Sequence, residues 1–322
     1  MRRRAFIHTM GAALSSPLAA HAQSRGRVPL VGVLVAESAP HPFTEAFRSG
    51  MRDLGYTEGR TVAIEWRYAD ALFKRAIELA TELVRLGVEV IAAHHTPAVK
   101  ASMTVTRTIP IVMSPAGAPL QTGLVESLAR PGANVTGLSS MEAELGSKRL
   151  ELLRSVIPGL GRVAVLGAKT DPFTRPYVED FQSAAARAGL QLQPVLVDGP
   201  NDFEEAFTAM AKAGAQAVVI QPLFEPHSPT IVRLGMKYRL AVMSSYRETT
   251  RAGGLISYSA DHTEYFKRAA SFVDRILKGA KPGELPVEQP TKFELVVNVR
   301  TARALGLAPP ESFLGRADEV IR

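Results

Sequence analysis

The stretch Val28-Pro29-Leu30-Val31-Gly32-Val33-Leu34-Val35 decides the fold class of this chain. A short apolar run without polar alternation is typical of a strand that is buried on both faces of a sheet. A helix is predicted next, because apolar residues recur at helical spacing from Phe43 to Leu54 and Gly55 then stops the pattern. A further strand is predicted at 61–66. This order of strand, helix and strand indicates a parallel sheet with helices on both faces.

The same alternation continues along the rest of the chain and begins anew near Glu142. Before that point the pattern predicts a helix at 73–84 and strands at 88–93 and 109–113. After it, helices are predicted at 145–156, 178–188, 203–213, 231–238, 265–277 and 302–305, and strands at 162–166, 191–197, 217–221, 240–244 and 294–299.

This repetition predicts two similar α/β domains, each a doubly wound parallel sheet, joined by a multi-strand hinge with a cleft between them. Gly253 to Ser259 are expected to carry the chain from one domain to the other. We expect an N-terminal lobe of residues 28–139 and 258–290, and a C-terminal lobe of residues 140–257 and 291–322. Both lobes are then discontinuous in sequence.

The composition excludes several classes of protein. The 322 residues include no cysteine, which excludes disulfides, thiolate metal sites, a cysteine nucleophile and a lipid-anchored N-terminus. The net charge of +7 falls to +4 once residues 1–22 are removed, because three arginines leave and 35 basic residues then face 31 acidic ones. No basic run is interleaved with aromatic residues, so nucleic acid is not an expected partner.

The first 22 residues have the layout of an export signal. Arg2 to Arg4 form a basic start, an apolar stretch runs from Phe6 to Ala20, and a small-x-small cleavage site ends at Ala22. Arg3-Arg4 also fits a twin-arginine-like signal, and an ordinary general-pathway signal stays open as the alternative. We therefore expect a periplasmic protein that is neither a lipoprotein nor embedded in the membrane.

The sequence contains no motif that predicts catalysis or a cofactor. Gly159-Leu160-Gly161 lies before a predicted strand, whereas a dinucleotide site needs its glycines after one. His94-His95 is the best candidate for a metal or an acid–base site, but neighbouring strand residues point to opposite faces. No catalytic residue, cofactor or metal site is therefore predicted. Glu142 and Glu144 are interpreted as acids near a helix start, where they favour the helix dipole.

Ligands of open α/β sheets bind beyond the carboxyl ends of the strands, and the turns there are rich in hydroxyls. Such a set suits a small polar or zwitterionic organic molecule. Tyr246, Tyr258 and Phe173 are candidates to stack on a planar ligand, and Arg247 to pair with a carboxylate. Capping of the following helix is the alternative for Ser38, Thr96 and Asp171. The predicted ligand-binding residues are Ser38, His95, Thr96, Ser114, Gly117, Asp171, Gln221, Tyr246, Arg247 and Tyr258.

Five motifs behind the exported N-terminus carry a resemblance over essentially the whole mature chain. They are GMRDLGY at 50–56 with Glu58-Gly59, ARPGANVTG at 129–137, KRLELL at 148–153, AGGLISY at 252–258 and LPVEQP at 285–290. Together they resemble ABC-transporter substrate-binding proteins related to the tryptophan/tyrosine-binding type. The resemblance implies a type I periplasmic-binding-protein fold without catalysis. It also implies a monomer that captures a small aromatic or amino-acid-like solute by hinge closure and presents it to an ABC permease in the inner membrane.

Two positions depart from the family pattern. Many members carry Gly-Asp-Pro after the fourth strand, where this chain has Gly117-Ala118-Pro119, and Lys169 stands in a turn that often reads Asn-Pro. Losing an acid and gaining a lysine favours a ligand with less positive charge, such as a carboxylate. Two other functions stay open at this point: an exported subunit that senses a ligand for a membrane receptor, and an exported enzyme.

Overall fold

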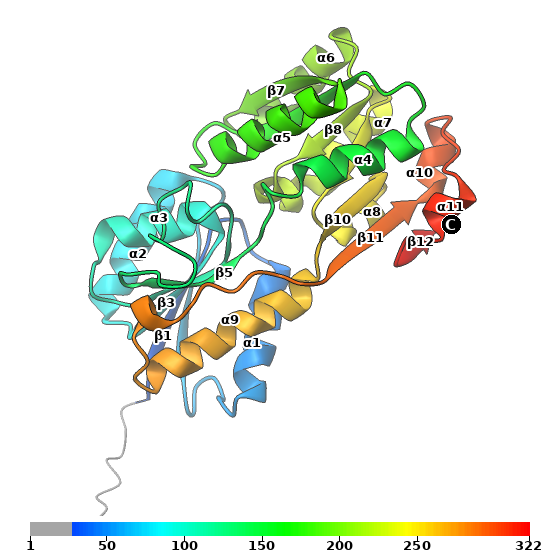
Figure 1. Ribbon diagram of the computed structural model, residues 1–322. Helices are drawn as coiled ribbons and strands as arrows, with labels where there is room; N and C mark the ends of the chain where they lie inside the picture. Colours follow the sequence, from blue (N-terminus) through cyan, green and yellow to red (C-terminus); the bar gives the residue numbers. More distant parts are fainter. Residues whose placement is uncertain (1–27) are drawn as a thin grey trace, which may run out of the picture.

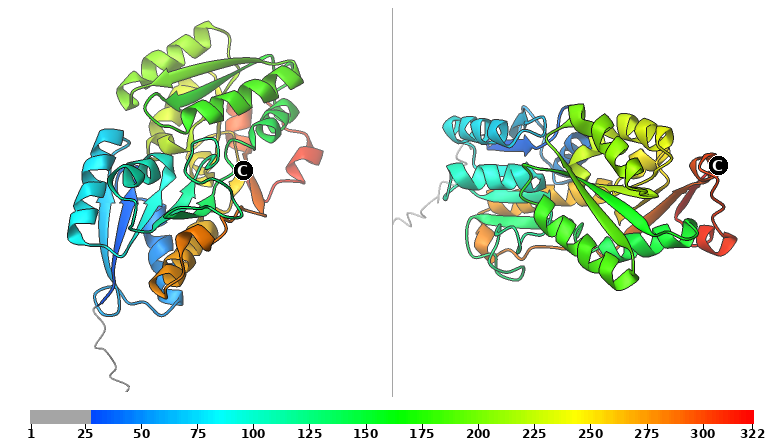
Figure 2. Two further views of the ribbon diagram at one scale, coloured as in Figure 1. Left: turned by 60° about the vertical axis from the view of Figure 1, so that its left-hand side comes forward. Right: turned by 90° about the horizontal axis from the view of Figure 1, so that it is seen from above.

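The computed structural model describes residues 28–322, which fold into two α/β lobes (Figure 1). The predicted export signal at 1–22 lies outside the described residues. Two further views show the two lobes side by side (Figure 2). Within 28–322, no helix is both long and apolar enough to cross a bilayer.

The first lobe is built on a five-stranded parallel sheet in the order β2-β1-β3-β4-β5. Alternate residues of β1 supply two cores, because successive side chains of a strand point to opposite faces. Val31 and Val33 pack with α1 and α9, whereas Leu34 packs with α2 and α3. The strands are β1 (Leu30–Val35), β2 (Ala63–Tyr68), β3 (Val90–His94), β4 (Ile111–Ala116) and β5 (Val135–Ser139), and the helices are α1 (Pro42–Asp53), α2 (Phe73–Leu86), α3 (His95–Val105) and α9 (His262–Leu277).

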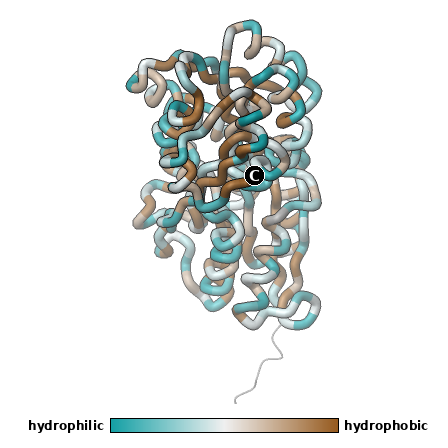
Figure 3. The backbone as a smooth tube through the Cα atoms, turned by 90° about the vertical axis from the view of Figure 1, so that its right-hand side faces the viewer, coloured by the Kyte–Doolittle hydropathy of each residue, from teal (hydrophilic) through white to brown (hydrophobic). Residues whose placement is uncertain are grey.

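The second lobe has a seven-stranded sheet in the order β12-β11-β10-β9-β8-β6-β7. Its strands are β6 (Arg162–Ala168), β7 (Gln191–Val197), β8 (Ala217–Ile220), β9 (Ala241–Ser244), β10 (Ile256–Ala260), β11 (Phe293–Asn298) and β12 (Glu319–Ile321). All neighbouring pairs are parallel except β10 and β11, where the returning chain runs antiparallel. Hydrophobic residues follow the strands through the interior of both lobes (Figure 3).

Helices cover both faces of the second sheet. One face packs against α4 (Gly146–Val156), α5 (Thr174–Ala188), α10 (Val299–Ala304) and α11 (Glu311–Leu314). The other packs against α6 (Phe203–Lys212) and α7 (Ser228–Lys237), and its core continues into the first lobe. Short elements complete the lobe: α8 (Arg247–Arg251) and the 3-10 turns η1 (Pro200–Asp202) and η2 (Pro222–His227), while η3 (Pro282–Glu284) follows α9.

The chain passes between the lobes three times: after β5, after β10, and before β11. Tyr265 of α9 ties two of these passages together, because its hydroxyl donates to the carbonyls of Ser139 and Glu288, each at 2.8 Å. The crossing between lobes that was predicted at 253–259 lies further along the chain. Strand β10 belongs wholly to the second sheet, and the chain leaves this sheet at Asp261. The boundary expected between 257 and 258 thus falls inside a strand.

One helix that positions the site, α3, was not predicted from the spacing of apolar residues. The α3 segment His95–Val105 is buried on most of its surface, including Thr96, Ala98 and Val99. A helix without a polar face gives no amphipathic signal, and its threonines and valines have lower helix propensity. Tertiary packing therefore stabilises this helix where local preference is weak.

Candidate functional site

The carboxyl ends of the central strands in the two sheets face each other across the cleft. Turns that follow β3 and β4 meet turns that follow β6 and β8, as the doubly wound topology requires of a ligand site. One cavity, here named the cleft cavity, opens between them. Its lining comes from both lobes: His95, Thr96, Pro115, Gly117, Ser140, Glu142, Asp171, Phe173, Pro222, Leu223 and His262.

Thr96 and Gly117 form the floor of the cleft cavity on the first lobe. The Thr96 hydroxyl accepts from the Gly117 amide and donates to the Gly117 carbonyl, both at 3.1 Å. Phe173 of the second lobe covers this glycine so closely that a Cβ there would lie 2.4 Å from the phenyl ring. The contact between lobes therefore depends on glycine at 117.

Asp171 supplies a carboxylate from the second lobe. One oxygen accepts from the Phe173 amide at 2.8 Å, and the other accepts from the side-chain amide of Gln221. Gln221 is fully buried and its own carbonyl accepts from the Ala168 amide at 2.8 Å, so it fixes the aspartate without lining the cavity. Burial raises the pKa of Asp171 to about 6, against the opposing effect of the Phe173 amide.

His95 reaches across the cleft from a left-handed backbone conformation with φ of 67°. Its Nδ1 lies 2.7 Å from Glu37 Oε1, and its Nε2 lies 3.3 Å from the Tyr246 hydroxyl of the second lobe. Burial alone would lower the pKa of His95, but the Glu37 carboxylate raises it more. The strand ends at His94, so His95 no longer follows strand alternation and both imidazoles can face one carboxylate.

Glu37 is the centre of a buried group of imidazoles. Its second oxygen, Oε2, lies 3.2 Å from His94 Nδ1, and Oε1 lies 3.8 Å from His41 Nε2. Burial would raise the pKa of Glu37, yet the surrounding imidazoles hold it well below its usual range. Burial lowers the pKa of His94 and His41, so both are neutral beside an ionised Glu37. The sequence shows no acid next to His94-His95; the fold brings one from the end of β1.

The family of this chain follows from its sequence profile together with this two-lobed site. The profile of the family described as ABC transporter substrate binding protein matches residues 31–321. The chain belongs to this family. The match and the two sheets confirm the family resemblance and the type I periplasmic-binding-protein fold predicted from the sequence.

Individual relatives and solved structures match this chain over most of its length. A tyrosine-binding protein of Clostridioides difficile (strain R20291) is 22% identical over 278 residues, which are 85% of this chain and 80% of that protein. An ABC domain from Streptococcus pneumonia, solved in complex with L-Trp, has a TM-score of 0.86 at 25% identity and covers 92% of this chain and 100% of its own. A leucine-binding protein from Thermotoga maritima has a TM-score of 0.60 at 14% identity, over 78% of this chain and 83% of its own.

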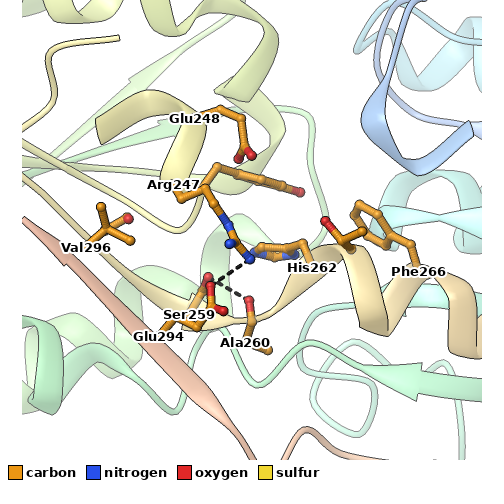
Figure 4. A pocket seen from close by; sticks show the side chains of 11 residues that line it. Arg247, Glu248, Ser259, Ala260, His262, Phe266, Glu294 and Val296 are labelled. Atoms are coloured by element: carbon orange, nitrogen blue, oxygen red, sulfur yellow. Dashed lines mark hydrogen bonds and ion pairs between the residues drawn. The ribbon is translucent and has the colours of Figure 1, made fainter. Parts of the chain in front are cut away.

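A second cavity of this substrate-binding protein, here named the hinge cavity, lies where β10 leads into α9. Figure 4 shows Arg247 extending over it toward Glu294 and His262. The Arg247 guanidinium lies 2.7 Å from Glu294 Oε2 and 3.1 Å from Asp261 Oδ1, so two carboxylates already neutralise it. The lining consists of Tyr246, Arg247, Glu248, Ser257, Ser259, Ala260, His262, Thr263, Phe266, Glu294 and Val296.

Glu142 connects the cleft cavity to the hinge. Its carboxylate lies 2.6 Å from the guanidinium of Arg149, which is completely buried in α4. The same guanidinium donates to the Ser245 hydroxyl at 2.9 Å and to the Tyr258 carbonyl at 2.8 Å. Helix α4 begins at Gly146, so Glu142 lies near a helix start as expected, but four residues before its first turn. Its partner is a buried cation instead.

The predicted ligand residues divide into three groups. The cleft cavity contains His95, Thr96, Gly117 and Asp171, and the hinge cavity contains Tyr246 and Arg247. The other four line neither: Ser38 lies in a groove at the lobe rim, Ser114 donates to the Val112 carbonyl at 3.1 Å, Gln221 supports Asp171, and Tyr258 stacks on Phe293. The two cavities contain Glu142 and His262, which were not predicted. Glu142 follows β5, a strand that the periodicity did not predict.

Proposed function

We propose that this protein captures a small aromatic or amino-acid-like solute in the cleft cavity and presents it to an ABC permease of the inner membrane. The observation that carries this proposal is the lining of the cleft cavity, which combines side chains from both lobes. A solute that touches both lobes binds the closed arrangement better than the open one. Binding therefore shifts the protein toward closure about its three hinge passages.

The lining supports a zwitterionic or aromatic solute. Phe173 and His262 offer ring faces, while Asp171 offers a carboxylate that attracts an amino group. Helix α3 begins at the cavity, and within 28–322 no side chain caps its first amides. These amides can therefore donate to the carboxylate of a solute.

Two features change the charge expected of the solute. Lys169 pairs with Asp198 at 2.7 Å on the surface and does not line the cavity. Arg247 is already paired with Asp261 and Glu294, which argues against a role as carboxylate clamp. The acid missing at Ala118 is offset by Asp171 from the opposite lobe. The balance therefore favours a solute with an amine rather than one with a lone negative charge.

Export and assembly complete the proposal. We infer that residues 1–22 direct the chain to the periplasm and are cleaved after about Ala22, and that the mature protein acts as a monomer. The family of substrate-binding proteins supports this location and the permease as partner. A binding role without turnover agrees with the sequence, in which no nucleophile–base motif is found.

Native mass spectrometry of the mature protein, followed by thermal-shift screening, tests the proposed function. The panel contains L-tryptophan, L-tyrosine, other amino acids, aromatic acids and small carboxylates. A ligand at about 100 times its dissociation constant adds roughly 2.7 kcal/mol of stability, which raises the melting temperature by several degrees. A co-purified mass, or a shift confined to one chemical class, is expected. If no bound mass is found and no compound of the panel raises the melting temperature, solute capture is contradicted.

A further inference from the structure

We propose that Glu37, His41 and His94 bind a divalent transition-metal ion of the zinc type beneath the cleft. One donor atom from each of these residues lies within 4.8 Å of the other two. Zinc takes imidazole nitrogens and carboxylate oxygens in tetrahedral sets, and two histidines with one glutamate form a known ligand combination. Bonds of about 2 Å place neighbouring donor atoms roughly 3 to 3.5 Å apart, so small adjustments bring the set to that geometry.

A nitrogen of each histidine lies close to the Glu37 carboxylate. His94 Nδ1 lies 3.2 Å from Glu37 Oε2, and His41 Nε2 lies 3.8 Å from Glu37 Oε1. The exposed fractions of Glu37, His41 and His94 are 1%, 4% and 0%. Among the described residues, the buried His41 Nε2 has no hydrogen-bond partner. Buried polar atoms in native proteins are nearly always satisfied, and a cation bound by Glu37, His41 and His94 would satisfy this nitrogen.

The surroundings exclude water from the proposed site. The Phe43 ring stacks on His94 with centroids 4.9 Å apart, and Phe266 meets the same imidazole edge-on at 4.9 Å. An apolar shell of this kind strengthens the attraction between a cation and its ligands. His95 lies on the cleft side, with Nδ1 2.7 Å from Glu37 Oε1, and holds the carboxylate from there.

Binding requires a change of tautomer at both histidines. His94 Nδ1 donates to the ionised Glu37 Oε2 at 3.2 Å, so coordination through Nδ1 moves that proton to Nε2. His41 Nδ1 accepts from the Phe43 amide at 3.2 Å, so the proton of the neutral ring sits on Nε2. Coordination through Nε2 moves that proton to Nδ1, and the capping bond at the start of α1 is given up. Such a cap contributes little to stability compared with the binding free energy of a zinc ion in a protein site.

Titration with metal alone tests the site independently of any solute. The tag-free mature protein is treated with EDTA, titrated with ZnCl2 in a calorimeter, and examined with CoCl2 by visible absorption. We expect a single equivalent of zinc with a dissociation constant below about 1 µM, and cobalt bands stronger than those of the hydrated ion. His94→Ala is expected to weaken zinc binding by at least about 100-fold, since an outer-shell change alone costs 10- to 100-fold. His227→Ala is the control and is expected to bind normally, because its histidine lies in η2.

Two outcomes would overturn the proposal. The first is a native protein that shows neither saturable zinc binding nor cobalt bands. The second is His94→Ala that binds zinc as tightly as the native protein. Circular dichroism checks that His94→Ala is folded, and if it is not, the cobalt spectrum of the native protein decides.

Discussion

The imidazole of His95 and the phenol of Tyr246 meet across the cleft, with Nε2 3.3 Å from the hydroxyl oxygen. His95 begins α3 in the first lobe, whereas Tyr246 follows β9 in the second. Tyr246 also stacks on His262 at the start of α9, with centroids 4.2 Å apart. This contact joins the two lobes and the hinge through three rings, so it is sensitive to how far the lobes are closed.

Tyr246→Phe removes the cross-lobe hydrogen bond and keeps the ring. A net hydrogen bond contributes about 0.5–1.5 kcal/mol, so solute affinity is expected to fall by about 2- to 12-fold. Calorimetry with the solute found in the screen measures the change. Tyr258→Phe is the matched control, because that side chain lines neither cavity. Equal affinities for native protein and Tyr246→Phe would show that the bond does not contribute to closure.

Gly117→Ala is expected to obstruct closure. A Cβ at this position would lie 2.4 Å from the Phe173 ring, whereas nothing lies within 4 Å of a Cβ at the control position Gly199. Overpacking costs about 1–3 kcal/mol, which predicts a loss of solute affinity of about 5- to 150-fold. Gly199→Ala should bind normally. In a Phe173→Ala background the obstruction is absent, so adding Gly117→Ala there should cost no further affinity. A further loss as large as in the native background would contradict this reason.

Asp171→Asn tests the pH dependence of the cleft. The pKa of Asp171 is about 6 in the folded protein, above its ordinary value of 3.8, so the folded state holds this proton after the unfolded state has released it. The free energy of unfolding therefore contains the full contribution of protonated Asp171 below pH about 4. It falls by roughly 3 kcal/mol as the pH rises through about 6 and the carboxyl ionises. Urea unfolding from pH 4.5 to 7.5 should show the native protein losing about 2 kcal/mol of this stability relative to Asp171→Asn. Parallel curves for the two proteins would disprove it, and Asp198→Asn serves as an exposed control.

Arg149→Met breaks a buried ion pair and is expected to destabilise the fold. It leaves the Glu142 carboxylate without its cation, and losing one partner of a buried pair costs about 3–5 kcal/mol. Chemical unfolding measures the loss. Arg175→Met is the control, because Arg175 pairs with Glu179 on the surface with 85% of its side chain exposed. A loss no larger than that of the control would show that the buried pair of Arg149 and Glu142 does not stabilise the fold.

The sequence by itself determined the elements whose patterns are local. Apolar runs and helical spacing predicted most strands and helices, because burial of a face imposes a period on the chain. The family motifs indicated the two-lobed fold. Four of the ten predicted ligand residues lie in the cleft cavity, since the carboxyl end of each parallel strand can be located from sequence.

Only the tertiary structure decided which of these turns share a cavity. Ser114 and Tyr258 lie in strands, so the face of the sheet on which each side chain lies depends on its position in the strand and on packing. Both side chains contact partners outside the cavities. The convergence of Glu37 with His94 and His95 depends on the pairing of β1 with β3 and on one left-handed residue. Such contacts join residues far apart in the chain, so no local pattern records them. Sequence thus determined the class of protein and its cleft, and the packing of two lobes determined the chemistry that the cleft presents.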